Sequence, residues 1–178
     1  YLRRSLRYWS NKEFKIIVCD GSTLPQYDFV EQLAASNITY MHSIEPLPLR
    51  LKMAADQIDT PYSILLSDDE FYLPSALNSC VDFLNSNSDY VAVGGVAVGF
   101  GIVESHIYGF KRYLNWIGRE RSESDPRDRL VTHMGDYTNN LSVSVTRSHL
   151  WKLSARFYAS REIPIFALYE LEMNVVLA

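Results

Sequence analysis

Short β-rich runs and helix-like segments alternate along residues 1–100 of this chain. Apolar residues recur at helical spacing in the longer segments, whereas the runs between them are short and apolar. This alternation favours an α/β domain with a mostly parallel sheet, in which ligands bind beyond the carboxyl ends of the strands. The predicted strands span residues 15–19, 38–42, 62–66 and 90–98, and the predicted helices span residues 2–9, 27–36, 49–58 and 75–85.

Residues 101–178 follow a less regular pattern. Their charged stretch from Arg119 to Arg129 is predicted to be an exposed loop. The last predicted helix, from Tyr169, is apolar to the final residue and shows no cap, so we expect the chain to be part of a longer protein. The other predicted elements are a strand at residues 141–145, a helix at 148–157 and a short segment at 163–166.

Length and composition fit one globular domain. The chain has 178 residues, of which 47% are hydrophobic and 21% charged, which allows a real core and is unlike a disordered segment. A formal net charge of −4 offers no electrostatic basis for general nucleic-acid binding. No apolar run approaches the ~20 residues that span a bilayer, so no transmembrane segment is expected.

The chain contains two cysteines, Cys19 in a strand-like run and Cys80 in a helix-like segment. Two cysteines are too few for a disulfide framework or a zinc site, so we expect buried free thiols and a reducing compartment. The predicted location is cytoplasmic, with the inner face of a membrane as the alternative.

Three consecutive acids, Asp68, Asp69 and Glu70, follow the predicted strand at residues 62–66. Adjacent carboxylates at the end of a buried strand repel one another, and they are tolerated where water, a divalent cation or a cationic partner neutralises them. Hard oxygen ligands suit Mg²⁺ or Mn²⁺, and these cations suit a diphosphate. The structural alternative is an acidic turn before the helix that Pro74 opens.

Four segments with recognisable motifs occur in a fixed order: residues 1–9 (YLRRSLRYW), 15–22 (KIIVCDGS), 49–58 (LRLKMAADQI) and 62–77 (YSILLSDDEFYLPSAL). This order resembles the nucleotide-sugar glycosyltransferases of the GT-A fold, in particular glycosyltransferase family 2. In that family a helix follows the first strand, the second strand ends in Asp-Gly-Ser, and a helix with basic residues comes next. A strand with an Asp-x-Asp type ending then leads into a helix that begins with proline.

The resemblance implies one GT-A (Rossmann-like) catalytic domain over residues 1–178, with a nucleotide-sugar-binding half in residues 1–100 and an acceptor-side half in residues 101–178. It implies metal-dependent, inverting transfer of a sugar from a nucleotide sugar, by default a uridine diphosphate sugar, with Mn²⁺ or Mg²⁺ as cofactor. The acceptor would be a hydroxyl of a glycan or a lipid-linked sugar. The family's first strand would precede Tyr1, so we expect the sheet to lack that strand.

Two other functions fit the same pattern. A GT-A-like domain without activity would bind a sugar nucleotide or act as a scaffold. A sugar-nucleotide pyrophosphorylase has a related fold, and it would open with a Gly-rich loop before Tyr1.

The resemblance assigns the donor site to the acidic strand ends. Asp20 would contact the base or ribose, although an Asp-Gly turn needs no ligand. Asp69 would ligate the metal and Asp68 would reach the ribose or lie behind the ligand, because Ser67-Asp68-Asp69 resembles a Thr-Asp-Asp version of the motif. In the alternative alignment, Asp68 and Glu70 form an Asp-x-Glu pair. Which of the three acids ligates the metal therefore stays open.

Two further pairs of residues in the first 100 positions each have a functional and a structural interpretation. Arg50 and Lys52 precede the acidic strand and would help neutralise a diphosphate, or they belong to a solvated helix face. Gly94 and Gly95 mark either the close approach of a ligand or a packing requirement.

An inverting transfer needs a general base that deprotonates the acceptor hydroxyl. The family carries this acid late in the domain, at the start of a helix, where Glu170 and Glu172 lie in this chain. Two acids in the first turn of a helix also stabilise it without any catalytic role. His133 and Asp136 are the alternative pair.

We predict that Glu170→Gln lowers sugar transfer by roughly 10²–10⁴-fold, the usual contribution of general acid–base catalysis, while donor affinity stays unchanged. Glu172→Gln is the matched control and should leave the chemical step unaffected. Single-turnover kinetics with a saturating donor measure both. If Glu172→Gln is the slow variant, the base is Glu172; if neither is slow, Asp136 is tested next.

Overall fold

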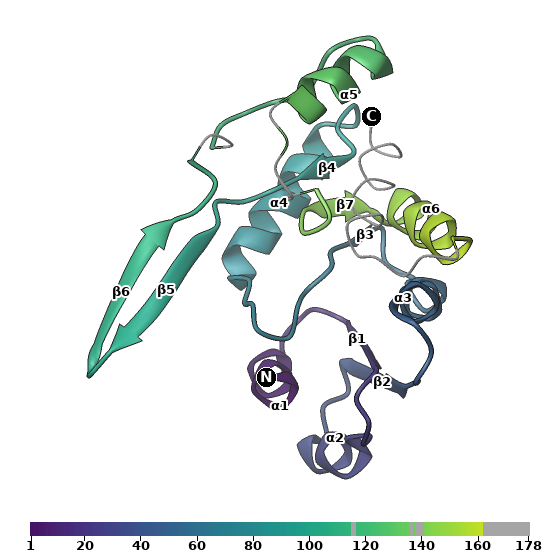
Figure 1. Cartoon of the computed structure of the whole chain (residues 1–178), viewed down its shortest axis with the longest axis vertical. Coiled ribbons are helices and arrows are strands. Elements are labelled where there is room, and N and C mark those ends of the chain that lie inside the picture. The colour runs from purple at the N-terminus through teal and green to yellow at the C-terminus, as the bar shows by residue number, and fades with distance from the viewer. Residues whose placement is uncertain (115–116, 136, 138–140, 162–178) are drawn as a thin grey trace.

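The computed structural model describes residues 1–114, 117–135, 137 and 141–161, and Figure 1 shows their arrangement. The helices are α1 (Leu2–Trp9), α2 (Tyr27–Leu33), α3 (Leu47–Asp56), α4 (Pro74–Ser86), α5 (Pro126–Gly135) and α6 (Ser148–Ala159). The strands are β1 (Ile16–Asp20), β2 (Ile38–His42), β3 (Tyr62–Ser63), β4 (Ala92–Val93), β5 (Val98–Val103), β6 (His106–Lys111) and β7 (Val145–Arg147). The predicted α/β class is confirmed at this level.

The strands form one parallel and two antiparallel sheets. β1 and β2 pair in parallel, with Ile16 opposite Ile38 and Asp20 opposite His42. β7 lies between β3 and β4 and is antiparallel to both, and β5 and β6 form a separate antiparallel hairpin. The described sheets therefore differ from the mostly parallel sheet expected from the sequence, because a late strand, β7, inserts between two earlier ones.

The apolar run at residues 62–66 forms a shorter strand than predicted. Only Tyr62 and Ser63 pair with β7, because a turn closed by the Ser144 N–H and the Leu141 carbonyl (3.1 Å) ends the partner strand. Within the described residues β1 pairs only with β2 and β3 only with β7. The additional strand expected from the family resemblance stays a prediction.

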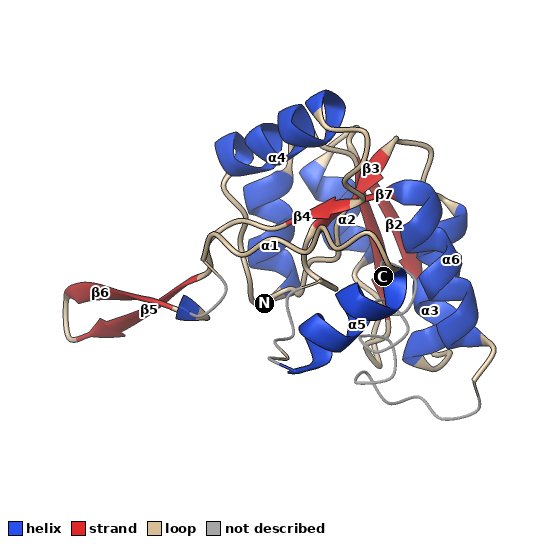
Figure 2. Ribbon diagram, turned by 90° about the horizontal axis from the view of Figure 1, so that it is seen from above, coloured by secondary structure: helices blue, strands red, loops and turns tan. Residues whose placement is uncertain are grey.

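The hairpin of β5 and β6 was not expected from the sequence, and it projects from the rest of the chain as an arm (Figure 1 and Figure 2). On one of its faces the rings of Phe110 and Tyr108 cover the cross-strand residues Gly99 and Gly101, where a Cβ would overlap the ring. Pairs of this kind stabilise a hairpin through aromatic packing. The predicted strand at residues 90–98 is therefore divided between β4 and the first residue of β5.

α5 begins at Pro126, inside the stretch from Arg119 to Arg129 that was predicted to be a loop. The Asp125 carboxylate accepts a hydrogen bond from the Arg127 N–H at 2.8 Å, and proline is favoured in the first turn of a helix. The loop prediction is wrong from Pro126 onward, because this cap was not recognised. The earlier part of the stretch contains no helix or strand.

The ends of three other elements moved for local reasons. α2 stops at Leu33 because Ala34 has a positive φ of 48°. α3 begins at Leu47, since Pro48 fits the first turn of a helix. β7 occupies Val145–Arg147 and not residues 141–145, and it leads directly into α6.

Two apolar clusters form the described core. The first joins α3 to α6 through Leu51 and Ala55 on one side and Trp151, Ala155 and Tyr158 on the other. Both alanines are 0% exposed, so the two helices approach closely at that point. The second cluster contains Trp9 from α1, Leu77 and Leu84 from α4, and Val145 from β7, and Ile16 of β1 packs against it.

Cys19 and Cys80 are free, half-buried thiols, and burial raises the pKa of each. Half-burial is less than the full burial that the sequence predicted. Among the helices of the described ranges, none combines the length and the apolarity needed to cross a membrane.

We predict that Ala55→Leu destabilises the protein by about 1–3 kcal/mol, the typical cost of overpacking a filled core. Ala55 is 0% exposed where α3 meets α6, so a larger side chain must separate the two helices. Ala76→Leu, on the exposed face of α4, is the matched control and should change stability by less than ~0.5 kcal/mol. Urea unfolding measures both, and equal stabilities would contradict the role assigned to this contact.

Candidate functional site

A pocket of about 640 Å³ lies where the chain leaves the apolar run after β3. One part of its wall is apolar and comes from α3 and from that run. The other part is polar and carries the acids predicted from the sequence. The lining residues are Tyr1, Leu47, Arg50, Leu51, Leu65, Leu66, Ser67, Asp68 and Asp69.

Arg50 connects this pocket with the end of β1. Its Nε–H donates to the Glu45 carbonyl at 3.0 Å and its Nη1–H to the Cys19 carbonyl at 3.2 Å. The Nη2 group makes no hydrogen bond within the described residues. The guanidinium is thus fixed in place and keeps the donors of Nη2 for a ligand.

Gly21 makes this position of Arg50 possible. A Cβ at residue 21 would overlap the Nη1, Cζ and Nε atoms of the Arg50 guanidinium. The glycine of the Asp-Gly-Ser turn is therefore required for the close approach of a side chain from α3. The same turn contacts Asp20 through Ser22 and Arg50 through Gly21.

The Asp20 carboxylate is 8% exposed and is already hydrogen-bonded. Oδ1 accepts from the Ser22 N–H at 2.8 Å, and Oδ2 accepts from the Ser22 hydroxyl at 2.9 Å and from the Tyr40 hydroxyl at 2.6 Å. Desolvation is the largest influence and favours the neutral acid, but these bonds together lower the pKa of Asp20. Burial and the bond to Asp20 raise the pKa of Tyr40 to about 12.

The three consecutive acids occupy an exposed turn. The Glu70 N–H donates to the Ser67 carbonyl at 3.2 Å, and the carboxylates of Asp68 and Asp69 accept no hydrogen bond within the described residues. Burial and the neighbouring Asp69 charge raise the pKa of Glu70, while Arg112 acts in the opposite direction. Exposure to water is how this fold tolerates the adjacent charges.

Tyr72 fixes the chain just after these acids. Its hydroxyl donates to the carbonyl of Leu65 at 3.1 Å, and its own carbonyl accepts from the Tyr8 hydroxyl at 2.9 Å. The half-buried Tyr72 therefore links the segment before the acidic turn to the segment after it. From α1, Arg4 also reaches the Asp69 carbonyl, at 3.5 Å.

The carboxylates at this pocket fit a divalent cation that is also coordinated by phosphate oxygens of a ligand. Within the described residues, no three carboxylate, imidazole or thiol groups converge as a protein-only metal site requires. Mg²⁺ in phosphate-binding sites is held by one or two carboxylates plus substrate oxygens. Asp68 and Asp69, unpaired and exposed at the pocket, meet that smaller requirement.

Several predicted site residues lie elsewhere. Lys52 faces away and pairs with Asp56 at 3.0 Å, and Glu70 does not line the pocket. Gly94 lies close to the Ser144 side chain, whereas Gly95 has open space beside it.

Of the four residues considered as bases, the structure describes only His133, and it does not line this pocket. His133 is 4% exposed in α5, where its ring meets that of Tyr137 edge to face. Asp136, Glu170 and Glu172 lie outside the described residues.

Sequence reasoning missed Tyr40, Tyr72 and the apolar wall of the pocket. Tyr40 reaches Asp20 because the parallel register places it beside Val18, two residues before Asp20. The register between two strands cannot be read from the sequence of one of them. The only signal for this contact was the hydroxyl-bearing Tyr40 within the strand at residues 38–42. Tyr72 lies two residues after Glu70, and this closeness to the acidic motif was the one available signal.

Comparison of the sequence with protein-family models found no matching model, and comparisons with curated proteins and with solved structures found no significant match.

We predict that Tyr40→Phe raises the pKa of Asp20, because it removes a donor to the charged carboxylate. A group whose pKa is lowered by folding stabilises the protein at pH values above its pKa in the unfolded state. This stabilisation is lost as the pH falls through the pKa of the folded state. Tyr40→Phe should therefore destabilise the protein at pH 7, and the difference should shrink as pH falls below about 3.8, the ordinary value for this group.

Denaturant unfolding at a series of pH values measures this. Tyr27→Phe is the control, since the Tyr27 ring packs on Tyr40 at 5.2 Å without bonding Asp20. A Tyr40→Phe effect that is independent of pH would contradict the assignment.

Proposed function

We propose that this chain binds a nucleotide sugar in the Asp68–Asp69 pocket and belongs to a glycosyltransferase that moves the sugar to a hydroxyl acceptor. The observation that supports this most directly is the convergence of three predicted donor-site segments. Arg50 bonds the end of β1 at Cys19, packs on Gly21 and lines one pocket with Asp68 and Asp69.

The two kinds of wall match the two ends of such a donor. Leu47, Leu51 and Leu65 offer apolar surface to a base or ribose, since small-molecule sites combine apolar walls with a few polar groups. Arg50 offers bidentate donors to phosphate oxygens. Asp20 is held by Ser22 and Tyr40, so its proposed role is to shape the loop that contacts the nucleoside.

A Mn²⁺ or Mg²⁺ ion held by Asp69, together with Asp68 or Glu70, would neutralise charge on the departing diphosphate. Arg50 would hold the same phosphates through hydrogen bonds, and the half-buried Tyr72 would keep the acidic turn in position. Glu170 would take the proton of the acceptor hydroxyl as that oxygen attacks the sugar carbon opposite the diphosphate. This step inverts the configuration at that carbon and leaves a nucleoside diphosphate.

The acceptor would be a glycan or a lipid-linked sugar, bound by residues 101–178, and the location would be cytoplasmic or at the inner face of a membrane. The second candidate is a domain that binds a sugar nucleotide without transferring it. The hydrogen bonds that occupy Asp20 favour this alternative. Measured transfer to any acceptor would exclude it.

We predict that Asp69→Ala abolishes the metal-dependent part of uridine diphosphate binding, and that Arg50→Gln weakens binding by roughly 10–100-fold, the effect of losing a hydrogen bond to a charged group. Calorimetric titration with and without Mn²⁺ measures both. Asp82→Ala, an exposed acid on α4, is the control. Unchanged affinity in Asp69→Ala would exclude the proposed metal ligand.

Gly21→Ala provides an independent test of the same site. The added methyl group must displace the Arg50 guanidinium, so its loss of affinity should match that of Arg50→Gln, with little loss of stability because only the end of a flexible side chain has to move. Gly95→Ala, which has no atom within 4 Å of the new methyl, is the matched control. Full affinity in Gly21→Ala would contradict the role of Arg50.

A further inference from the structure

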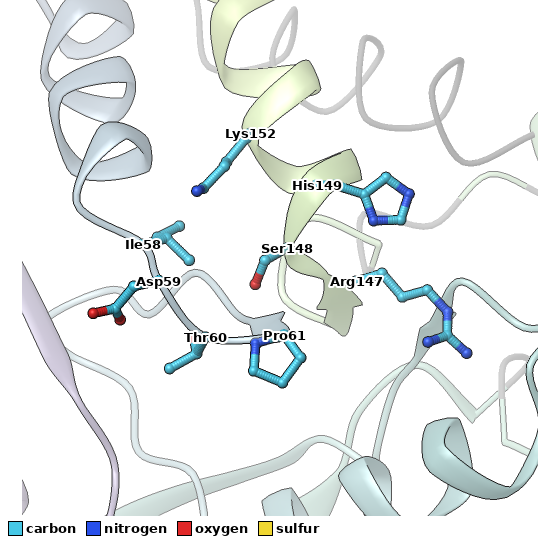
Figure 3. Close-up of a pocket in the computed structure, with 8 residues that line it drawn as sticks. All are labelled: Ile58, Asp59, Thr60, Pro61, Arg147, Ser148, His149 and Lys152. Atoms are coloured by element: carbon cyan, nitrogen blue, oxygen red, sulfur yellow. The ribbon is translucent and has the colours of Figure 1, made fainter.

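A second pocket, of about 430 Å³, is drawn in Figure 3. It lies beside the start of β3, whereas the acids come after the end of that strand. Its walls are the connection from α3 to β3 and the start of α6. Because β3 and β7 are antiparallel, the beginning of β3 and the end of β7 meet there, away from the Asp68–Asp69 pocket. The lining residues are Ile58, Asp59, Thr60, Pro61, Arg147, Ser148, His149 and Lys152.

Ser148 presents a buried hydroxyl without a partner. The residue is 5% exposed, and its Oγ makes no hydrogen bond to any residue that the structure describes. In Figure 3 this oxygen points into the space bordered by Thr60 and Pro61. A buried hydroxyl that lacks a partner costs free energy, so a ligand that accepts a hydrogen bond from it would recover that cost.

The same residue begins α6, a helix of 12 residues whose first turn has no side-chain cap. The Ser148 N–H donates to the Pro61 carbonyl at 2.9 Å, which holds the helix start against the α3–β3 connection. The first turn of a helix presents backbone N–H groups and positive potential, and both favour an anion.

The side-chain charges around the pocket favour an anion as well. Asp59 is paired with Lys15 at 2.6 Å, so its charge is compensated. Lys152 forms no ion pair within the described residues, although its charge contributes to the lowered pKa of Asp59, and Figure 3 shows its ammonium group directed toward the pocket. The Arg147 guanidinium points away and donates to carbonyls of Tyr90 and Leu84, each at 2.9 Å.

We propose that this second pocket binds the phosphoryl group of a small phosphorylated molecule. The Ser148 hydroxyl, the N–H groups of His149 and Leu150 in the first turn of α6 and the Lys152 ammonium donate to its oxygens, whereas the Ser148 N–H remains bonded to the Pro61 carbonyl. A tetrahedral anion has enough acceptor oxygens to take all of these donors at once. This site is separate from the proposed donor site and does not depend on it.

Titration of the whole 178-residue chain with inorganic phosphate and with a sugar phosphate tests the proposal. At about ten times the dissociation constant, either ligand should raise Tm by roughly 3–6 °C. In amide NMR spectra, the shifts should concentrate at His149 and Leu150. A rise with the sugar phosphate alone would show that the site reads more than the phosphoryl group, whereas no response to either ligand would overturn the proposal.

Ser148→Ala separates a ligand role from a structural one. Removing an unpaired buried hydroxyl should leave the Tm of the free protein unchanged or higher, while the phosphate-induced rise is lost. Ser154→Ala is the matched control, because Ser154 is 0% exposed, has an unpaired Oγ on the same helix and does not line the pocket. It should keep the full rise.

Two charge variants complete the test. Lys152→Gln should weaken phosphate binding by about tenfold, whereas Arg50→Gln should leave the shifts of His149 and Leu150 intact. If Arg50→Gln abolishes them, or if Ser148→Ala responds to phosphate like the natural chain, the anion binds elsewhere and the proposal is wrong.

Discussion

The contact between α3 and α6 holds the described part of this fold together. β1–β2 and β3–β7–β4 share no hydrogen-bonded ladder, so packing must connect them. α3 lies against β1, and its Leu51 and Ala55 meet Ala155 and Tyr158 of α6, which continues directly from β7. Two small residues at 0% exposure set the helix separation, and dense packing makes that separation costly to change.

Both pockets depend on this arrangement. The first turns of α3 carry Arg50 to the acidic turn, and the chain that follows α3 forms one wall of the second pocket. α3 and the connection that follows it therefore border a pocket at each end of β3. The charges of the described residues differ between the two pockets. One has the carboxylates of Asp68 and Asp69 beside Arg50, and the other has Lys152 and the start of α6 beside Asp59, which is paired with Lys15.

Hydrogen bonding separates the predicted site residues into those already bonded within the protein and those open to a ligand. Asp20 ends β1, whereas Asp69 lies in the turn that follows the apolar run at residues 62–66. The Asp20 carboxylate accepts hydrogen bonds from Ser22 and Tyr40, and the Asp69 carboxylate accepts none within the described residues. The first carboxylate is held in place by the protein, and the second is open to a ligand. Arg50 differs from Lys52 in the same way, because Lys52 is already paired with Asp56 on the outer face of α3.

Local patterns in the sequence determined much of the fold. The apolar spacing predicted α1 and β2 with their observed ends, and the order of elements through α4 was correct, because each depends on neighbours a few residues apart. The acidic turn and the Asp-Gly-Ser turn were also visible as motifs. The cap at Asp125 was visible too but went unrecognised.

Only the tertiary structure decided which residues meet. Three features join segments distant in the chain: the insertion of β7 between β3 and β4, the bond from Tyr40 to Asp20, and the close approach of Arg50 to Gly21. Such contacts depend on strand register and helix packing, which one-dimensional periodicity does not contain. The same holds for Ser148: its sequence neighbours mark a helix start, and its burial without a partner exists only in the folded protein.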